Sequence, residues 1–474
     1  MAVSVALVTA LSVSPLLGAS AQASPVGKVE SLVRKYEASS GAICGVQVVD
    51  LRTDRRLVSI REDRQFIPAS NQKLLTSAFA LAKLGPDHQF VTSVYRLGES
   101  LLVVGGGDPT LGDPIIAARK GADIYCELDR WAEAVKNTFG GDVPSDLLVC
   151  GGFSLTKRRH EDWPAKQRSR WYCAPIAGLN FHNNCFEAAF VVDDKSVRAS
   201  VSPSSRHIKV SNKVARGKRH LWSLRTSEND SRVVLTGTVS KSTTTALRVA
   251  CENPPMLLGW VLADRLARAG VRLSGQVRLV KRGEPDTSGA TLLARTVTPL
   301  ADVLRRANKL SLNMAAECLF LHAGDGTWRG SAEKMKAAMV SEYAIDGQDL
   351  TVRDGGGLSR LNRVTPRAVC GVLSGLALRR GAQAFLKSLP RSGTDGSLAK
   401  RLTRKPYSGR ILAKTGYINS ASCLSGYVLD GDYRVALAFS ILVGNVKLGK
   451  AWVAKDCQDS ICRVLVGWMD GEGK

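Results

Sequence analysis

Four serines in this sequence are each followed, three residues later, by a lysine: Ser70/Lys73, Ser154/Lys157, Ser331/Lys334 and Ser397/Lys400. Residues at i and i+3 share one face of a helix, so the amine can reach the hydroxyl and take its proton. Each pair alone is better explained as a helix-capping serine beside a solvated lysine. Only Ser70 opens an apolar, alanine-rich run, residues 71–84, which Gly85-Pro86 ends.

Two further motifs follow in the chain. The first is Ser311-x-Asn313, and the second, Lys414-Thr415-Gly416, is the single Lys-Thr-Gly in the sequence. Ser-x-Asn also occurs at Ser227-Glu228-Asn229. The order Ser-x-x-Lys, Ser-x-Asn, Lys-Thr-Gly resembles that of penicillin-binding proteins and serine β-lactamases. Order and context therefore favour Ser70 over the other three serines.

The side chains of the first two motifs suit acyl transfer. Ser70 is the predicted nucleophile that forms an acyl-enzyme, and Lys73, neutral at least transiently, is its predicted base. A positive neighbour such as Lys414 would help to lower the pKa of Lys73. Ser311 is expected to relay a proton to the leaving amine, and Asn313 to hold Lys73 or the substrate amide. Ser311 and Asn313 could instead be capping residues.

The third motif is predicted to bind substrate. Lys414 offers positive charge to a carboxylate, Thr415 adds a hydroxyl donor, and Gly416 would let the substrate backbone lie close to a strand. The backbone N–H groups of Ser70 and Tyr417 are the predicted oxyanion hole. Alternatively, Lys414 is a surface lysine on a strand.

More of the chain resembles one branch of this superfamily, the class C low-molecular-mass penicillin-binding proteins. The resemblance covers nearly all of the chain after its N-terminal segment. It rests on the segments around the three motifs and on residues 84–87 (LGPD), 105–111 (GGGDPTL), 172–175 (YCAP), 183–184 (NN), 354–362 (DGGGLSRLN) and 389–396 (LPRSGTDG). The chain departs from the family pattern at Gly356, Ser397, Leu312 and Cys150, and none of these is expected to touch the motif side chains.

The resemblance implies an α+β fold, in which a β-lactamase/transpeptidase-like antiparallel sheet packs with helices and a large mixed insertion interrupts it. The implied limits are residues 24–100 and 291–474 for the split catalytic domain and 101–290 for the insertion. The implied activity is that of a serine D-alanyl-D-alanine carboxypeptidase, also an endopeptidase, on peptidoglycan stem peptides and cross-links. β-Lactam antibiotics would acylate Ser70, and a peptide would add as a strand beside Lys414-Thr415-Gly416.

Local patterns place these motifs. Residues 29–36 have helical periodicity, residues 45–51 and 57–60 read as a hairpin, and residues 411–416 as a strand. A second hairpin is expected at residues 425–443, and a C-terminal helix at 449–469.

The composition bounds location and partners. The formal charge is +24, which favours an anionic cell wall or membrane surface, but basic residues are dispersed and no nucleic-acid module is expected. Residues 1–23 read as a signal peptide, which predicts an exported, periplasmic or cell-envelope protein. Neither a metal site nor a cofactor is expected. Of the 11 cysteines, Cys173 with Cys185, or Cys150 with either, could form disulfides.

Two other functions fit parts of the pattern. A β-lactamase or esterase of the same superfamily would share all three motifs. A non-catalytic protein that binds the cell wall through its positive charge would keep the motifs as a dead site.

Overall fold

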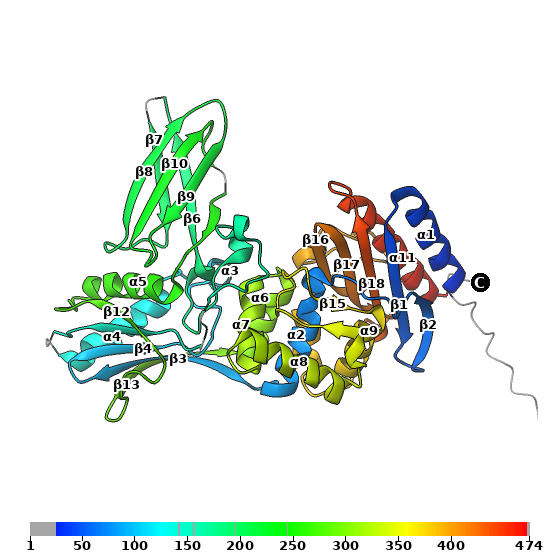
Figure 1. Ribbon diagram of the computed structural model, residues 1–474, viewed down its shortest axis with the longest axis horizontal. Coiled ribbons are helices and arrows are strands. Elements are labelled where there is room, and N and C mark those ends of the chain that lie inside the picture. Colours follow the sequence, from blue (N-terminus) through cyan, green and yellow to red (C-terminus); the bar gives the residue numbers. More distant parts are fainter. Residues whose placement is uncertain are drawn as a thin grey trace, which may run out of the picture.

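A computed structural model describes residues 25–471 except 141–142, 154, 156, 195 and 244. The predicted signal peptide, residues 1–23, and Ser154 lie outside the described residues. Two lobes are evident, one built from both ends of the chain and one from its middle (Figure 1). The three motifs all belong to the first lobe.

The first lobe is organised on a five-stranded antiparallel sheet in the order β16-β17-β18-β1-β2. The predicted hairpins form β1 and β2 at one end and β17 and β18 in the middle. The bounds are β1 Ile43–Asp50, β2 Arg55–Ile60, β16 Ile411–Ile418, β17 Ser420–Leu429 and β18 Val435–Val446. Lys414-Thr415-Gly416 therefore lies on an edge strand, as the resemblance implied.

Helices cover both faces of this sheet. Alternate residues of β18 divide between them: Phe439 packs with α1 and α11, whereas Ala438 and Leu442 pack with the helices of the other face. The terminal helices are α1 (Val26–Ser40) and α11 (Ala451–Met469). The other face carries α2 (Gln72–Leu84), α6 (Leu300–Lys309), α7 (Asn313–Ala323), α8 (Trp328–Tyr343), α9 (Pro366–Ala377) and α10 (Ala382–Ser388). The α+β expectation is confirmed.

Helix α2 lies at the centre of the helical layer. Every residue from Gln72 to Leu81 is buried, because α2 contacts α6, α7, α8 and α9 as well as the sheet. A helix buried on all sides needs the apolar, alanine-rich composition that residues 71–84 have. Gly85, with φ 78°, ends it. The Ser70–Lys73 segment thus leads directly into a buried helix.

The second lobe contains another five-stranded sheet, in the order β12-β5-β4-β3-β13, with α4 and α5 packed on it. Two three-stranded sheets, β8-β10-β9 and β11-β6-β7, stand beyond α5 (Figure 1). The bounds are β3 Gln89–Leu97, β4 Ser100–Val104, α3 Pro114–Arg119, α4 Cys126–Phe139, β5 Leu147–Cys150, β6 Cys185–Val192, β7 Val197–Ser202, β8 Lys209–Arg216, β9 Leu221–Thr226, β10 Arg232–Val239, β11 Leu247–Ala250, α5 Pro254–Arg268, β12 Val277–Val280 and β13 Thr291–Pro299.

One sheet of the middle lobe crosses both of the expected limits of the insertion, residues 101–290. Strand β3 pairs with both β4 and β13, so the expected limits at 100 and 291 cut through one sheet. We propose that the insertion runs from the end of α2 to the start of α6, since a sheet folds as one cooperative unit.

The expected disulfides are absent from the structure. All 11 cysteines are free thiols, Cys173, Cys185 and Cys150 among them. Cys457 and Cys462 do share one helix, α11, as the sequence predicted. None of the described helices is both long and apolar enough to cross a bilayer.

The burial of α2 makes a prediction about stability. Phe79 is fully buried in the helical layer, so Phe79→Ala should lower the free energy of unfolding by about 3–5 kcal/mol through lost contacts and a cavity. Urea denaturation followed by tryptophan fluorescence measures this loss. Leu378→Ala is the control, because Leu378 is 87% exposed and its loss should cost less than about 0.5 kcal/mol. Equal effects of the two changes would contradict the packing described.

Candidate active site

Ser70 lies in a single 3-10 turn, η1 (Ala69–Asn71), immediately before α2. Ala69 precedes it with a left-handed φ of 47°, a conformation that non-glycine residues adopt only where the surroundings enforce it. Asn71 anchors the turn to the sheet, since its Nδ2 donates to Ser425 Oγ of β17 at 2.7 Å. The serine is therefore held by both the helix and the sheet.

Lys73 lies one turn further along, fully buried, with its Nζ 3.0 Å from Ser70 Oγ. The same Nζ donates to Asn313 Oδ1 at 2.7 Å and to the Gly356 carbonyl at 2.5 Å. Asn313 Nδ2 donates to the Tyr172 carbonyl at 2.9 Å. This bond fixes which end of the Asn313 amide faces the lysine. The spacing of Ser70 and Lys73 thus has the structural consequence that the sequence predicted.

The second and third motifs meet at another hydrogen bond. Lys414 Nζ donates to Ser311 Oγ at 2.9 Å and to the Thr415 carbonyl at 2.7 Å, and Lys414 is fully buried. Ser311 has a left-handed φ of 59° at the point where the chain enters α7. Lys414 is thus a buried side chain under the site, and not a surface lysine.

Strand β16 runs directly against the serine turn. A Cβ on Gly416 would lie 2.9 Å from the Pro68 carbonyl oxygen, closer than side-chain carbons normally come. We expected this glycine to make room for substrate, but the close neighbour is the turn that carries Ser70. On the other face of β16, Thr415 Oγ1 donates to Ser397 Oγ at 2.7 Å, and Tyr417 is 47% exposed.

These residues line a cavity of about 520 Å³ at the meeting point of the two lobes. Ser70, Ser311, Asn313, Thr415 and Tyr417 face it, and Lys73 and Lys414 lie behind them. The inserted lobe contributes Asp162, Pro164, Gln167, Trp171 and Tyr172 to its wall. A cavity of this size can hold a peptide or a small drug-sized molecule.

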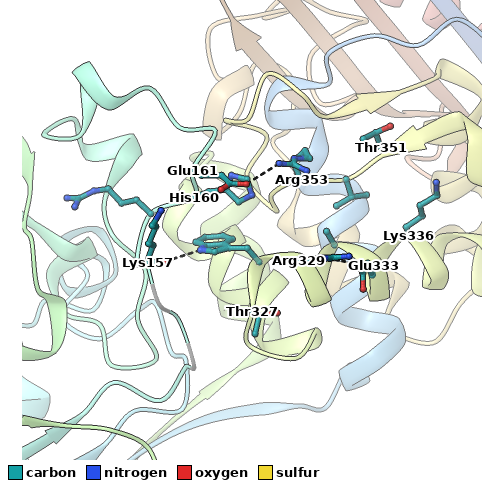
Figure 2. Close-up of a pocket in the computed structure, with 13 residues that line it drawn as sticks. Lys157, His160, Glu161, Thr327, Arg329, Glu333, Lys336, Thr351 and Arg353 are labelled. Carbon is teal, nitrogen blue, oxygen red and sulfur yellow. Dashed lines mark hydrogen bonds and ion pairs between the residues drawn. The ribbon is translucent and has the colours of Figure 1, made fainter.

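A larger cavity, about 780 Å³, lies between the segment that contains Lys157, His160 and Glu161 and the start of α8 (Figure 2). Its lining is mostly charged, including Glu161 and Arg353, which form an ion pair, and Trp328 Nε1 donates to the Lys157 carbonyl at its edge. Among the described residues that line it there is no serine. The smaller cavity, with its paired serines and lysines, is the candidate active site.

Burial sets the charge state of both lysines. Loss of solvation lowers the pKa of Lys73 to about 8, against the negative charges of Glu317 and Asp354, which raise it. Burial also lowers the pKa of Lys414, and the charge of Lys73 lowers it further. We expected Lys414 to help lower the pKa of Lys73, but burial is the main cause. Lys73 therefore loses its proton near pH 8, well below the range of an ordinary lysine.

The structure brings together every predicted catalytic side chain and adds contacts that the sequence analysis missed. Gly356 and Ser397 were expected to leave the motif residues untouched, yet Gly356 binds Lys73 and Ser397 binds Thr415. Glu317, buried one turn after Asn313, was given no role in the sequence analysis. The sequence did contain an indication of this role. Glu317 is an acidic residue in an otherwise apolar helix, and such a residue is buried only where it has hydrogen-bond or ion-pair partners.

The other candidates from the sequence lie elsewhere. Ser331 is buried within α8, Ser397 begins no long helix, and the second Ser-x-Asn, at Ser227, occupies a turn between β9 and β10. Among the described residues, no group of three or more His, Cys, Asp or Glu side chains is placed to hold a metal ion.

The contact between Gly416 and the serine turn can be tested. Gly416→Ala should displace the turn and slow acylation of Ser70 by at least about tenfold, because small displacements of a nucleophile cost this much. The rate is measured with a fluorescent penicillin. Gly431→Ala is the matched control, since a Cβ there meets nothing within 4 Å. A wild-type rate in the Gly416 variant would contradict the tight approach.

Comparison with known proteins agrees with this geometry. The model of the D-Ala-D-Ala carboxypeptidase 3 (S13) family matches residues 26–466. A D-alanyl-D-alanine carboxypeptidase from Actinomadura sp. (strain R39) is 32% identical over 457 residues, which cover 90% of this chain and 81% of the relative. The fold is similar to that of penicillin binding protein 4 from Haemophilus influenzae, with a TM-score of 0.74, 20% identity, and coverage of 91% and 98% of the two chains.

A more distant structure shares the fold over most of its length. It is a penicillin G-acylated predatory endopeptidase from Bdellovibrio bacteriovorus, with a TM-score of 0.50, 16% identity, and coverage of 90% of this chain and 92% of that one. The chain thus belongs to the D-Ala-D-Ala carboxypeptidase 3 (S13) family, and it is a low-molecular-mass penicillin-binding protein with serine D-alanyl-D-alanine carboxypeptidase function.

Proposed function

We propose that Ser70 is the nucleophile and Lys73 the base with which this chain hydrolyses the terminal D-alanyl-D-alanine bond of peptidoglycan stem peptides. The observation that carries the proposal is the set of three hydrogen bonds around the buried Lys73 amine. A serine hydroxyl needs such a neighbour to become nucleophilic.

The partners of Lys73 differ in kind, and this difference orients the amine. The Asn313 Oδ1 and the Gly356 carbonyl accept hydrogen bonds and cannot donate them. A neutral amine has two hydrogens and one lone pair. With its hydrogens on these two acceptors, the lone pair of Lys73 points to the third partner, the Ser70 hydroxyl 3.0 Å away. In this arrangement the base is aimed before substrate arrives.

The reaction then proceeds in two stages. Ser70 Oγ bonds to the substrate carbonyl carbon as its proton passes to Lys73, and the C–N bond to the terminal D-alanine breaks. Ser311, hydrogen-bonded to Lys414, relays a proton to the leaving amine, and the proton that Lys73 took from Ser70 replaces the one that Ser311 gives up, so Lys73 is neutral again. In the second stage water loses a proton to Lys73 as its oxygen bonds to the ester carbonyl carbon, and this proton returns to Ser70 Oγ as the ester C–O bond breaks.

We assign substrate binding to strand β16. It is an edge strand, so an extended peptide can add beside it by backbone hydrogen bonds. Lys414 lies behind Ser311. A substrate carboxylate there would favour its ammonium form, against the burial that lowers its pKa. Thr415, Gly416 and Tyr417 line or support the cavity. The N–H groups of Ser70 and Tyr417 remain the predicted oxyanion hole.

The same site is proposed to cleave cross-links between stem peptides. A cavity of about 520 Å³ with a wall from each lobe has room on both sides of the scissile bond. The Bdellovibrio protein that shares the fold is named an endopeptidase, which supports this proposal. The +24 charge supports electrostatic association with an anionic cell wall or membrane surface, and residues 1–23 support export to the periplasm or cell envelope.

The first test is covalent labelling. Incubation with penicillin should add one penicilloyl group by intact mass, and peptide mapping should place it on Ser70. Ser70→Ala should abolish the adduct. Ser331→Ala, in the other described Ser-x-x-Lys on a long helix, should keep it. An adduct that persists in Ser70→Ala would refute the assignment of the nucleophile.

The second test is the lifetime of that adduct. A carboxypeptidase should release the penicilloyl group slowly and release D-alanine from a peptide ending in D-alanyl-D-alanine. Rapid turnover of penicillin without release of D-alanine would instead favour a β-lactamase.

The third test is pH. The neutral form of Lys73 is scarce below its pKa of about 8 and dominant above it, so the acylation rate should rise about tenfold per pH unit up to about 8 and then level off. Stopped-flow measurement with a fluorescent penicillin between pH 5.5 and 9.5 gives this profile. A flat profile over that range would rule out Lys73 as the titrating base.

A further inference from the structure

Glu317 is a fully buried carboxylate that the mechanism above does not use. It lies on α7 four residues after Asn313, so both side chains point from the same face of the helix. Glu317 Oε2 accepts the N–H of Gly355 at 2.8 Å, and Oε1 accepts the N–H of Gly356 at 2.7 Å. Both oxygens are thus committed to two successive backbone groups.

The carbonyls of the same two glycines face the opposite way, towards α2. The Gly355 carbonyl accepts from Thr76 Oγ1 at 2.7 Å, and the Gly356 carbonyl accepts from Lys73 Nζ at 2.5 Å. The two glycines therefore link α7 to α2. Because a peptide unit is planar, the bond from Gly356 N–H to Glu317 fixes the direction of the Gly355 carbonyl. The bond from Gly357 N–H to Asp354 Oδ1 fixes the direction of the Gly356 carbonyl in the same way, once Glu317 has placed the segment.

The absence of side chains allows this close approach. A Cβ on Gly356 would lie 2.6 Å from Glu317 Oε1, and a Cβ on Gly355 would lie 2.4 Å from Phe320 Cβ. Asp354 fixes the rest of the loop, because its carboxylate accepts the N–H groups of Gly357 and Ser359 at 2.8 and 2.7 Å. The short strands β14 (Leu350–Thr351) and β15 (Arg363–Val364) pair on either side of the loop.

Glu317 also contributes charge in its ionised form. Burial raises the pKa of its carboxyl well above the ordinary value, whereas the hydrogen bonds from the two glycine N–H groups and the charge of Lys73 lower it. The groups that face Lys73 are Ser70, Asn313, the Gly356 carbonyl, the carboxylates of Glu317 and Asp354, and the Lys414 amine. A negative charge near Lys73 favours the ammonium form over the amine. The same residue that orients the base therefore also moves the pH at which the base becomes available.

We propose that Glu317 is a positioning residue: by holding the N–H groups of Gly355 and Gly356, it places the glycine segment whose Gly356 carbonyl binds Lys73, and its charge sets the pH range in which Lys73 can accept the Ser70 proton. This inference rests on the proposed role of Lys73 as the base.

The test compares two conservative substitutions in the full chain. Glu317→Gln keeps the shape but removes the charge, and it places an NH2 against a glycine N–H. The acylation rate on the plateau of the pH–rate profile should fall at least about tenfold. The rising part of the profile on the acidic side, the acidic limb, should move to lower pH by about one unit, because loss of a nearby negative charge lowers the pKa of Lys73. Glu317→Asp keeps the charge but shortens the reach, so the rate should fall while the limb stays near its wild-type pH.

Two results overturn the proposal. A wild-type plateau rate in Glu317→Gln would show that the glycine segment does not need this anchor. A lower rate with an unmoved limb in Glu317→Gln would show a structural role alone. Thr76→Val is the matched control, since it frees the Gly355 carbonyl without changing charge; its rate should fall without movement of the limb.

The outcome remains separable from that of the proposed function. If wild-type protein shows no adduct on Ser70, the proposed function fails before Glu317 is tested. In the Glu317 variants, peptide mapping should still find the adduct on Ser70, and thermal melting checks that they fold. If Glu317→Gln does not fold, Gly356→Ala carries the test: its Cβ presses on Glu317 Oε1, so an unreduced plateau rate would overturn the proposal.

Discussion

The burial of the Lys73 amine is the constraint on which the active site depends. An ammonium group loses much of its solvation in a protein interior, so burial favours the neutral amine that a base must be. Two buried carboxylates oppose this effect without forming a direct ion pair with the lysine, and backbone and amide oxygens supply its hydrogen bonds. The result is an amine close to the balance between its two protonation states.

This arrangement explains why the helical layer and the sheet are built so tightly around one turn. Helix α2 is buried along most of its length, and β16 approaches the turn so closely that position 416 has no room for a side chain. Left-handed backbone at Ala69 and Ser311 is found where the surrounding packing enforces it. The packing that stabilises the lobe thus also fixes the reacting atoms.

Much of this could be predicted from the sequence, and the remainder has a physical reason. The contact between Ser70 and Lys73 could be predicted, because an apolar run identified the helix and residues three positions apart lie on one face of a helix. The pairing of strand β3 with strand β13 was not predicted, because it joins residues about 200 positions apart in the sequence. The roles of Glu317 and the Gly356 carbonyl depend on the path of a glycine loop, which periodicity does not reveal. Helix α8 was missed because few of its residues are buried.

The hydrogen bond from Asn313 to the Tyr172 carbonyl has a wider consequence. Tyr172 belongs to the inserted lobe, whereas Asn313 and Lys73 belong to the lobe that carries the nucleophile. The orientation of the Lys73 amine therefore depends on both lobes, each of which has its own hydrophobic core. An evolutionary or engineered shortening of the chain that removed the middle lobe would leave the Asn313 amide free to turn over, with its NH2 facing the lysine. The inserted lobe therefore helps to hold the Asn313 side chain, and through it the Lys73 amine, in place.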